Sequence, residues 1–300
     1  MQRSKASTFA YLVVAAMLAW PALASAQGNS AYGHSHKGSR VTAPSSPNSS
    51  SPSSSPGSVA TEGPSYGVDV RNFGTWLDDA SVMERGSGFV TIGFAYWRGT
   101  AFREFDLPLV DTGMAVHKRV QVGVSFPYYY AGEPGGPVVR GLGNVYMTTK
   151  VQLRDPESHP VAFAVTPMLE VLDSAPLDGA SRVNWALPAN VEFRREGWRA
   201  FGSGGYFSRG ALFASGAVEA ALSNRAWVVA SLSQSYSIKA DELTAALALP
   251  RGQTDVNGGL TVALSPKIAT YATVGHTVSN REINAGTLNL AGGVSFNFSR

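Results

Sequence analysis

The chain has 300 residues, no cysteine, and 24 Lys and Arg against 21 Asp and Glu, which gives a formal net charge of +3. The lack of cysteine excludes disulfides, thiolate metal sites and a lipid anchor on an N-terminal cysteine. Two basic residues, Arg3 and Lys5, lie in a segment that we expect to be removed, so 22 basic and 21 acidic residues remain and the charge falls to +1. A chain so near neutrality gives no argument for a nucleic acid partner.

Residues 1–26 have the pattern of a secretory signal peptide. Arg3 and Lys5 make a positive start, an apolar run follows from Phe9 to Trp20, and Ala24-Ser25-Ala26 is a small-x-small cleavage signal. The run is too short to span a membrane, and nothing after it approaches the ~18 consecutive apolar residues that a membrane helix needs. We therefore expect export and a mature chain that begins at Gln27.

Residues 27–66 are low in complexity, and the stretch from Thr42 to Ser58 is almost wholly Ser, Pro, Gly and Asn. Such a segment buries too little apolar surface to offset its ordering entropy, so we predict a disordered linker on the periplasmic side. His34 and His36 lack a third ligand, and such pairs are more often solvated polar residues than a metal site. We predict no metal and no cofactor.

Residues 67–87 form a transition with two open interpretations. Apolar and acidic side chains mix here in a pattern that suits a short amphipathic helix, whose members are Trp76, Leu77, Asp78, Asp79, Val82, Met83 and Glu84. Its apolar face would lie against a barrel rim or enter the lumen as a plug. The alternative is an irregular lead-in to the first strand.

The sequence pattern changes in residues 88–300, where segments of about ten residues alternate apolar with small or polar side chains. The clearest runs from Asn144 to Arg154, with one face formed by Val145, Met147, Val151 and Leu153. Successive side chains of a strand point to opposite faces, so each segment has one apolar and one wettable face. Twelve such segments occur: 88–97, 104–116, 120–130, 143–154, 161–172, 182–195, 198–207, 211–221, 226–237, 254–264, 268–278 and 286–298.

This pattern predicts an all-β fold, an antiparallel transmembrane β-barrel of about twelve strands in a bacterial outer membrane. A soluble β-sandwich is the main alternative, but most connections between the segments are short. Aromatic residues gather at segment ends, as membrane girdles require, and the inner faces carry charges that a dry sandwich core would not tolerate. The wettable faces contribute Lys150, Arg154, Glu170, Glu192, Arg194, Arg199 and Glu219 as candidate lumen-lining residues.

Connection lengths alternate along the chain. The short ones are 117–119, 155–160, 196–197, 222–225 and 265–267, and the long ones include 131–142, 173–181, 238–253 and 279–285. Single-chain bacterial barrels have short periplasmic turns and long extracellular loops, so the long connections should face outside.

Segment 104–116 departs from strict alternation. Its apolar face runs through Phe105, Leu107 and Leu109 and then changes parity to Met114 and Val116. A bulge near Asp111 to Gly113 would repair the register.

The last strand, Gly293 to Phe298, resembles the C-terminal signal by which outer-membrane barrels are recognised for assembly. We expect Gly293, Phe296 and Phe298 to contact the barrel-assembly machinery, although Ser299 and Arg300 trail the motif.

Catalysis is not predicted. An outer-membrane phospholipase needs a His and a Ser at hydrogen-bond distance with an orienting partner, and no His-x-Ser pair lies on a strand. Asp106 and Asp111 are possible acids, but the sequence places no base beside them.

Several stretches resemble the outer-membrane family named after the MetA pathway of phenol degradation. They are Asp106 to Leu109 leading through Val116 to Val124 and Phe126-Pro127, Gly141 to Val145 with Lys150 and Leu153 after it, and Gly292 to Phe298. The resemblance implies an outer-membrane channel for small, often hydrophobic or aromatic compounds and carries over no binding residues.

Two functional hypotheses follow. A barrel of about eight strands is filled by its own side chains, whereas about sixteen leave an open pore, so twelve allow a narrow path. The first hypothesis is a monomeric, passive channel for small solutes. The second is a closed structural or adhesive barrel, in which the inner charges form a salt-bridge network.

Overall fold

The computed structural model describes residues 77–99, 103–132, 136–155, 159–172, 182–208, 210–238, 251–279 and 286–299. The expected signal peptide, the linker and the first part of the transition segment, including Trp76, lie outside these residues, as do parts of the long connections. No helix in the described part of the chain is long and apolar enough to cross a membrane.

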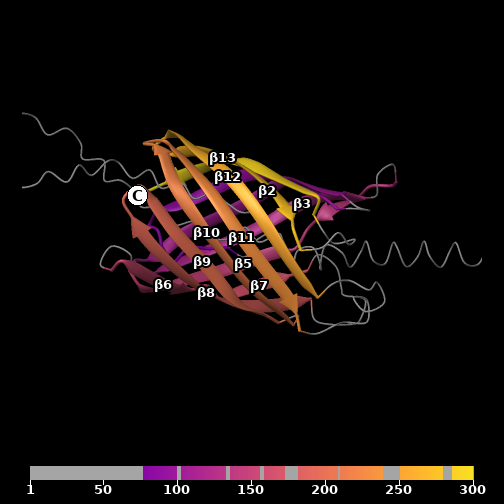
Figure 1. The fold of residues 1–300 in the computed structure, drawn as a ribbon, viewed down its shortest axis with the longest axis horizontal. Coiled ribbons are helices and arrows are strands. Elements are labelled where there is room, and N and C mark those ends of the chain that lie inside the picture. The colour runs from indigo at the N-terminus through magenta and orange to yellow at the C-terminus, as the bar shows by residue number, and fades with distance from the viewer. Residues whose placement is uncertain are drawn as a thin grey trace, which may run out of the picture.

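The described chain folds into antiparallel strands joined by turns (Figure 1). In chain order the strands are β1 (Gly88–Arg98), β2 (Arg103–His117), β3 (Val120–Gly132), β4 (Val139–Leu142), β5 (Val145–Arg154), β6 (Val161–Val165), β7 (Met168–Val171), β8 (Val183–Arg195), β9 (Trp198–Phe207), β10 (Ala211–Ser223), β11 (Ala226–Ser237), β12 (Gly252–Ser265), β13 (Ile268–Thr277) and β14 (Leu288–Phe298).

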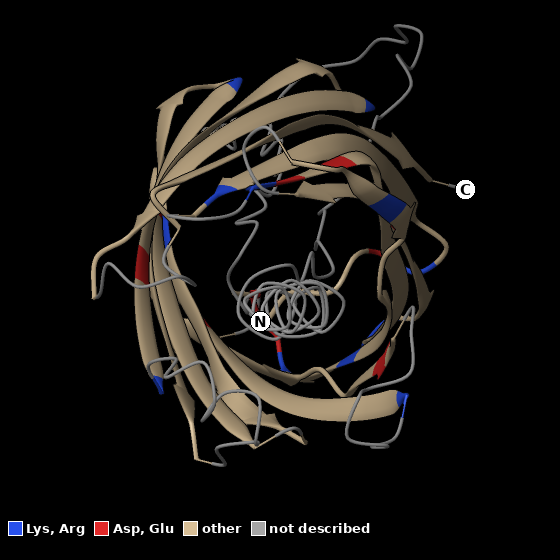
Figure 2. Ribbon diagram, turned by 90° about the vertical axis from the view of Figure 1, so that its right-hand side faces the viewer, with Lys and Arg blue, Asp and Glu red and all other residues tan. Residues whose placement is uncertain are grey.

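These elements form twelve wall strands in a closed barrel. β4 and β5 both pair with β3, and β6 and β7 both lie between β5 and β8, so each pair is one strand with an interruption. The second interruption contains Pro167, which has no N–H to give to a ladder. β1 pairs with β14 from Gly88↔Phe298 to Arg98↔Leu288, and this seam closes the sheet into the ring seen in Figure 2. The predicted fold class is confirmed.

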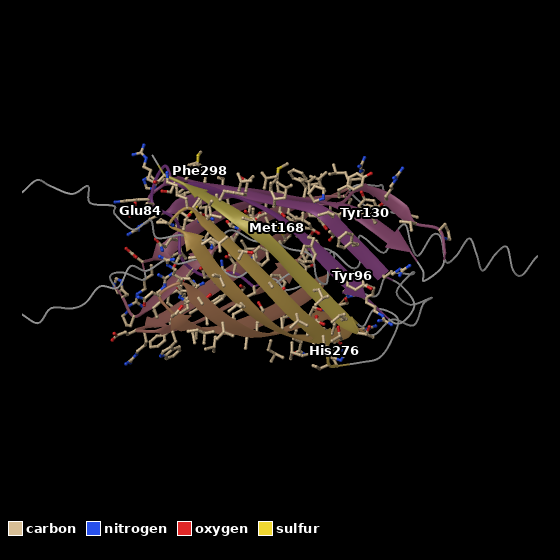
Figure 3. All side chains as sticks on the ribbon, turned by 90° about the horizontal axis from the view of Figure 1, so that it is seen from above. Glu84, Tyr96, Tyr130, Met168, His276 and Phe298 are labelled. Carbon is tan, nitrogen blue, oxygen red and sulfur yellow. The ribbon has the colours of Figure 1, made fainter. Side chains whose placement is uncertain are left out.

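The outer face of the barrel is apolar. In β8 the side chains of Trp185, Leu187 and Val191 are exposed, whereas those of Asn190 and Glu192, on either side of Val191, are buried. This arrangement is the inverse of a soluble domain, and it suits a barrel whose surroundings are lipid. Apolar side chains cover the outside of the ribbon in Figure 3.

Aromatic pairs lie near both ends of the strands. Trp185 and Tyr206 have ring centroids 5.7 Å apart at the end that bears the long connections. Phe193 and Trp198 lie 5.6 Å apart at the end that bears the tight turns. Such paired bands match the interfacial girdles of membrane barrels.

The irregularity in β2 lies earlier than the sequence indicated. Asp111 to Gly113 continue in register with β1, so the bulge expected there is wrong. The register shifts instead between Asp106 and Leu109, where Leu107 and Pro108 are both exposed. The physical reason is Pro108, which cannot donate a ladder hydrogen bond and is therefore confined to bulges and edges.

The transition segment is not helical in its described part. Residues 77–83 have an irregular backbone with a bend at Ala80, and a turn follows at Arg85 and Gly86. The expectation of a short amphipathic helix is therefore wrong for these residues, and the irregular lead-in is right. The segment enters the barrel, because Leu77 to Ser81 and Met83 are buried. We call residues 77–83 the inner segment.

Candidate functional site inside the barrel

The inner segment crosses the lumen and contacts three parts of the wall. Leu77 packs against Ala217 of β10 and Val229 of β11. Ala80 packs against Ala162 and Ala164 of β6, and Met83 packs against Phe89 of β1 and Ala115 of β2. Because these strands are distributed around the ring, the segment spans the interior.

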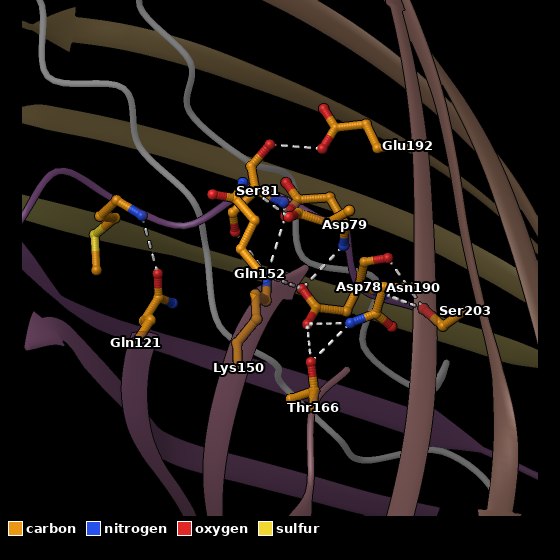
Figure 4. Close-up of polar contacts among 12 residues, drawn as sticks. Asp78, Asp79, Ser81, Gln121, Lys150, Gln152, Thr166, Asn190, Glu192 and Ser203 are labelled. Atoms are coloured by element: carbon orange, nitrogen blue, oxygen red, sulfur yellow. Dashed lines mark hydrogen bonds and ion pairs between the residues drawn. The ribbon is translucent and has the colours of Figure 1, made fainter. Parts of the chain in front are cut away.

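Lys150 of β5 holds the acidic part of the inner segment. Its Nζ donates to Asp78 Oδ1 at 2.7 Å, to Asp79 Oδ1 at 3.0 Å and to the carbonyl oxygen of Ser81 at 3.2 Å. Figure 4 shows Lys150 beside Asp78, Asp79 and Ser81. Lys150 is only 2% exposed, so its ammonium is almost wholly desolvated. An ammonium has three donors, and the three acceptors here all belong to one short piece of chain.

Arg199 of β9 joins the inner segment to the wall. Its Nη1 lies 2.9 Å from Asp79 Oδ2 and 3.6 Å from Glu192 Oε1. Its Nε lies 2.8 Å from Glu219 Oε1, and its guanidinium carbon lies 4.7 Å from the centre of the Phe201 ring. The planar guanidinium thus links carboxylates on β8, β10 and the inner segment.

Ser81 connects the inner segment to β8. Its hydroxyl donates to Glu192 Oε2 at 2.6 Å and accepts from Arg194 Nη2 at 2.6 Å. Arg194 Nε also donates to Glu192. Arg194 is partly exposed, and it marks the edge of the buried network.

Uncharged wall side chains satisfy the backbone of the inner segment. The N–H of Asp78 donates to Ser203 Oγ at 2.6 Å, and this hydroxyl donates back to the Asp78 carbonyl oxygen at 3.0 Å. Gln152 Nε2 donates to the Ala80 carbonyl at 3.3 Å, and Gln121 Oε1 accepts from the Met83 N–H at 3.3 Å. Backbone polar groups that are shielded from water need hydrogen-bond partners within the protein. These wall side chains supply such partners and so fix the position of the inner segment.

Five of the seven candidate lumen residues meet in this network: Lys150, Glu192, Arg194, Arg199 and Glu219. Glu170 is buried in a separate cluster and accepts from Asn144 Nδ2 at 2.9 Å and Tyr146 Oη at 3.0 Å. Arg154 is exposed. A register shift after Gln152 places it opposite exposed Phe163 on the outer face, so the inward orientation expected from strict alternation is wrong there.

A buried apolar cluster lies beside Glu170 on the inner side of the wall. Met168, Ala186, Phe207 and Phe213 pack with the Tyr146 ring, whose hydroxyl reaches the Glu170 carboxylate. The wall from β5 to β10 is therefore apolar in one zone and charged in another.

A second polar cluster joins β12 and β13. Asp255 accepts from Gln253 Nε2 at 3.0 Å and from the Thr277 hydroxyl, and the Gly286 N–H donates to Thr277 Oγ1 at 2.9 Å. Glu104, Asp106 and Asp111 of β2 are also buried. No group of three or more His, Cys, Asp or Glu among the described residues is arranged to hold a metal ion.

The histidines that the structure describes lie away from this interior. His117, His159 and His276 are exposed, and His276 Nδ1 lies 2.9 Å from the carbonyl oxygen of Thr287. His276 sits between Val274 and Val278, which are exposed as well.

The inward polar residues that pattern reasoning missed are those that hold the inner segment. Asp78, Asp79 and Ser81 precede the first strand and so have no period to reveal their direction. Gln121, Gln152, Asn190 and Ser203 lie on the wettable faces of strands, but without charge they gave no signal of their own. Two adjacent acids just before a barrel sequence were the one available indication.

The described chain is thus a closed antiparallel barrel with an apolar exterior, a charged interior and a segment of its own chain across the lumen. No family model and no curated protein matches the sequence. Its fold is similar to that of an outer membrane channel from Pseudomonas putida F1, with a TM-score of 0.54 and 10% identity over 73% of this chain and 98% of that chain. It is also similar to the NanC porin, with a TM-score of 0.51 and 9% identity over 69% of this chain and 98% of that chain. At such identities the likeness establishes the fold, that of outer-membrane channels and porins.

Proposed function

We propose that the protein resides in the bacterial outer membrane and passes small solutes passively through a narrow lumen that the inner segment constricts. The exposed apolar band and the channel-type fold support the location. The signal peptide of residues 1–26 and the periplasmic linker of residues 27–66 are part of the same proposal. No catalytic role is proposed, since the fold and the polar clusters support transport.

The observation that carries the channel proposal is the set of buried charges of both signs around the inner segment. Lys150 pairs with two carboxylates of the inner segment at 2.7 and 3.0 Å. Arg199 pairs with carboxylates of the inner segment, β8 and β10 at 2.8 to 3.6 Å. Desolvation cancels much of the attraction in a dry ion pair, so a network of this size is a poor way to stabilise a solid interior. It is favourable where water fills the adjoining lumen.

The apolar cluster around Tyr146 and Phe207 on the inner side of the wall favours small hydrophobic or aromatic compounds as the solutes. The motif resemblance to the phenol-degradation family supports the same class, and membership of that family is proposed on those motifs alone. Sites for such ligands are mostly apolar with a few fixed polar groups, and Glu170 beside this cluster would be one such group.

The alternative is a closed structural or adhesive barrel. The inner segment favours it, because three apolar contacts and the Lys150 and Arg199 pairs fasten one piece of chain across the interior. In that case the network would serve rigidity alone.

Planar bilayer recordings separate the two functions. The full-length protein should show small, infrequent openings, and the D78N/D79N variant should show larger or more frequent ones, because its inner segment loses its charge contacts. Glu84→Gln is the matched control, since Glu84 is exposed at the barrel end (Figure 3) and should leave conductance unchanged. Liposome uptake of a small aromatic solute should follow the same order. If the full-length protein, D78N/D79N and a form lacking residues 28–83 are all silent and impermeable, the closed barrel is the right function.

A further inference from the structure

Exposed cations surround the end of the barrel that bears the tight turns. We call them the basic rim: Arg85, Lys118, Arg119, Arg154, Arg195, Arg225 and Lys267, all exposed. Arg85 lies in the turn before β1, and the other six lie in or beside the connections that join β2 to β3, β5 to β6, β8 to β9, β10 to β11 and β12 to β13. The described acids at this end are Glu84, Asp155 and Glu196, so seven cations against three anions leave a formal charge of +4.

The basic rim directly follows the apolar outer band. Lys118, Arg225 and Lys267 come two or three residues after exposed Val116, Leu222 and Leu264. Lys and Arg have long apolar stems and extend their charges along a surface to the nearest polar layer. These cations are therefore within reach of the headgroups of the lipids whose acyl chains cover the band.

Arg195 of the basic rim lies beside a pair of aromatic rings. The guanidinium carbon of Arg195 lies 5.5 Å from the centre of the Phe193 ring, and Phe193 packs against Trp198. Trp198 is 42% exposed, on the outer face. An aromatic pair with a cation beside it provides an interfacial anchor and a charge at the same height in the membrane.

We propose that the basic rim binds the anionic phospholipid headgroups of the leaflet that surrounds this end of the barrel. Charge complementarity selects this partner, because zwitterionic headgroups carry no net charge while the rim carries an excess of cations. Each Lys or Arg close to an anionic lipid surface strengthens association by about fivefold. The inference rests on the proposed membrane location and is independent of whether the lumen conducts.

The test uses full-length protein in phosphatidylcholine vesicles that contain phosphatidylglycerol, with bromine on the acyl chains of one lipid at a time. Bromine quenches nearby indole fluorescence, and the difference between wild type and W198F isolates the signal of Trp198. Brominated phosphatidylglycerol should quench that signal at least about fivefold more effectively per mole than brominated phosphatidylcholine. In K118Q/R119Q/R195Q/R225Q/K267Q the two lipids should quench nearly equally.

Arg98, Arg103 and Arg140 are exposed at the opposite end of the strands, so R98Q/R103Q/R140Q is the matched control and should keep the preference at Trp198. Equal quenching by the two lipids in wild type, or an unchanged preference in the rim variant, would overturn the proposal while leaving membrane insertion intact. If neither lipid quenched Trp198, the membrane location itself would fail.

Discussion

Lys150 Nζ lies 2.7 Å from Asp78 Oδ1, and this contact joins β5 to a residue 72 positions earlier in the chain. Nothing in the regular sheet requires the two to meet. The two residues meet because the inner segment enters the barrel. A substitution of either one therefore tests the role of that segment directly.

Removal of the ammonium should release the inner segment. Lys150→Gln leaves the Asp78 and Asp79 carboxylates buried without their main cation, a change that costs up to about 3–5 kcal/mol when it occurs in a dry interior. The protein avoids this cost by moving the segment into water rather than by unfolding the wall. Open probability in planar bilayers should therefore rise several-fold, with unchanged heat-modifiable gel mobility. Lys118→Gln, in an exposed turn, should change neither, and equal conductance in both variants would contradict the role given to Lys150.

The lumen should prefer cations. The buried charged residues among those described are nine acids and two bases. Fixed charge of one sign concentrates counter-ions in a confined aqueous path. Under a potassium chloride gradient the reversal potential should have the sign of cation preference, and D106N/D111N should move it toward zero without loss of assembly. An anion-selective reversal potential would show that these acids do not face the conducting path.

Replacing Lys150, Arg194 and Arg199 together with Gln should alter selectivity further and still allow assembly, because the strand ladders do not depend on these side chains. The expected result is a stronger cation preference than in wild type, measured by the same gradient. Loss of the heat-modifiable form would instead mean that the network is needed to build the barrel.

The β1–β14 seam should be sensitive to side-chain volume. A Cβ on Gly293 would lie 2.8 Å from Gly93 Cα and 2.8 Å from Ile92 O, both backbone atoms that cannot easily move. Gly293→Val should therefore destabilise the closed barrel by about 1–3 kcal/mol and lower its heat-modification temperature. Gly258→Ala, where the nearest atom lies at 3.9 Å, is the control and should behave like wild type.

Orientation in the membrane can be mapped with inserted tags. Tags at Gly135, Asp178 and Leu247, in the long connections, should be accessible on intact cells, and a tag between Ser265 and Pro266 should not. This accessibility pattern is expected because single-chain bacterial barrels have short turns on the periplasmic side and long loops outside. The reverse labelling pattern would place the basic rim in the outer leaflet.

Most of the wall could be predicted from alternation, because a half-lipid, half-water environment imposes a period of two on every strand. The strand number, the closure and the faces of Lys150, Glu192 and Glu219 follow from it. Arg154 and the bulge in β2 were misplaced because one extra residue inverts every later side chain, and only the pairing partner fixes where that residue goes. The inner segment escaped prediction because its geometry is set by wall residues distant in sequence.

The inner segment is covalently continuous with β1, so any free molecule that binds at its place in the lumen competes with a tethered segment. Once released, it stays tethered within a few residues of its seat, so its effective concentration there is of millimolar order. A free peptide with the sequence of residues 77–83 would have to exceed that concentration to take its place. Occupancy of the lumen is thus set by an intramolecular equilibrium that does not change with the amount of protein in the membrane.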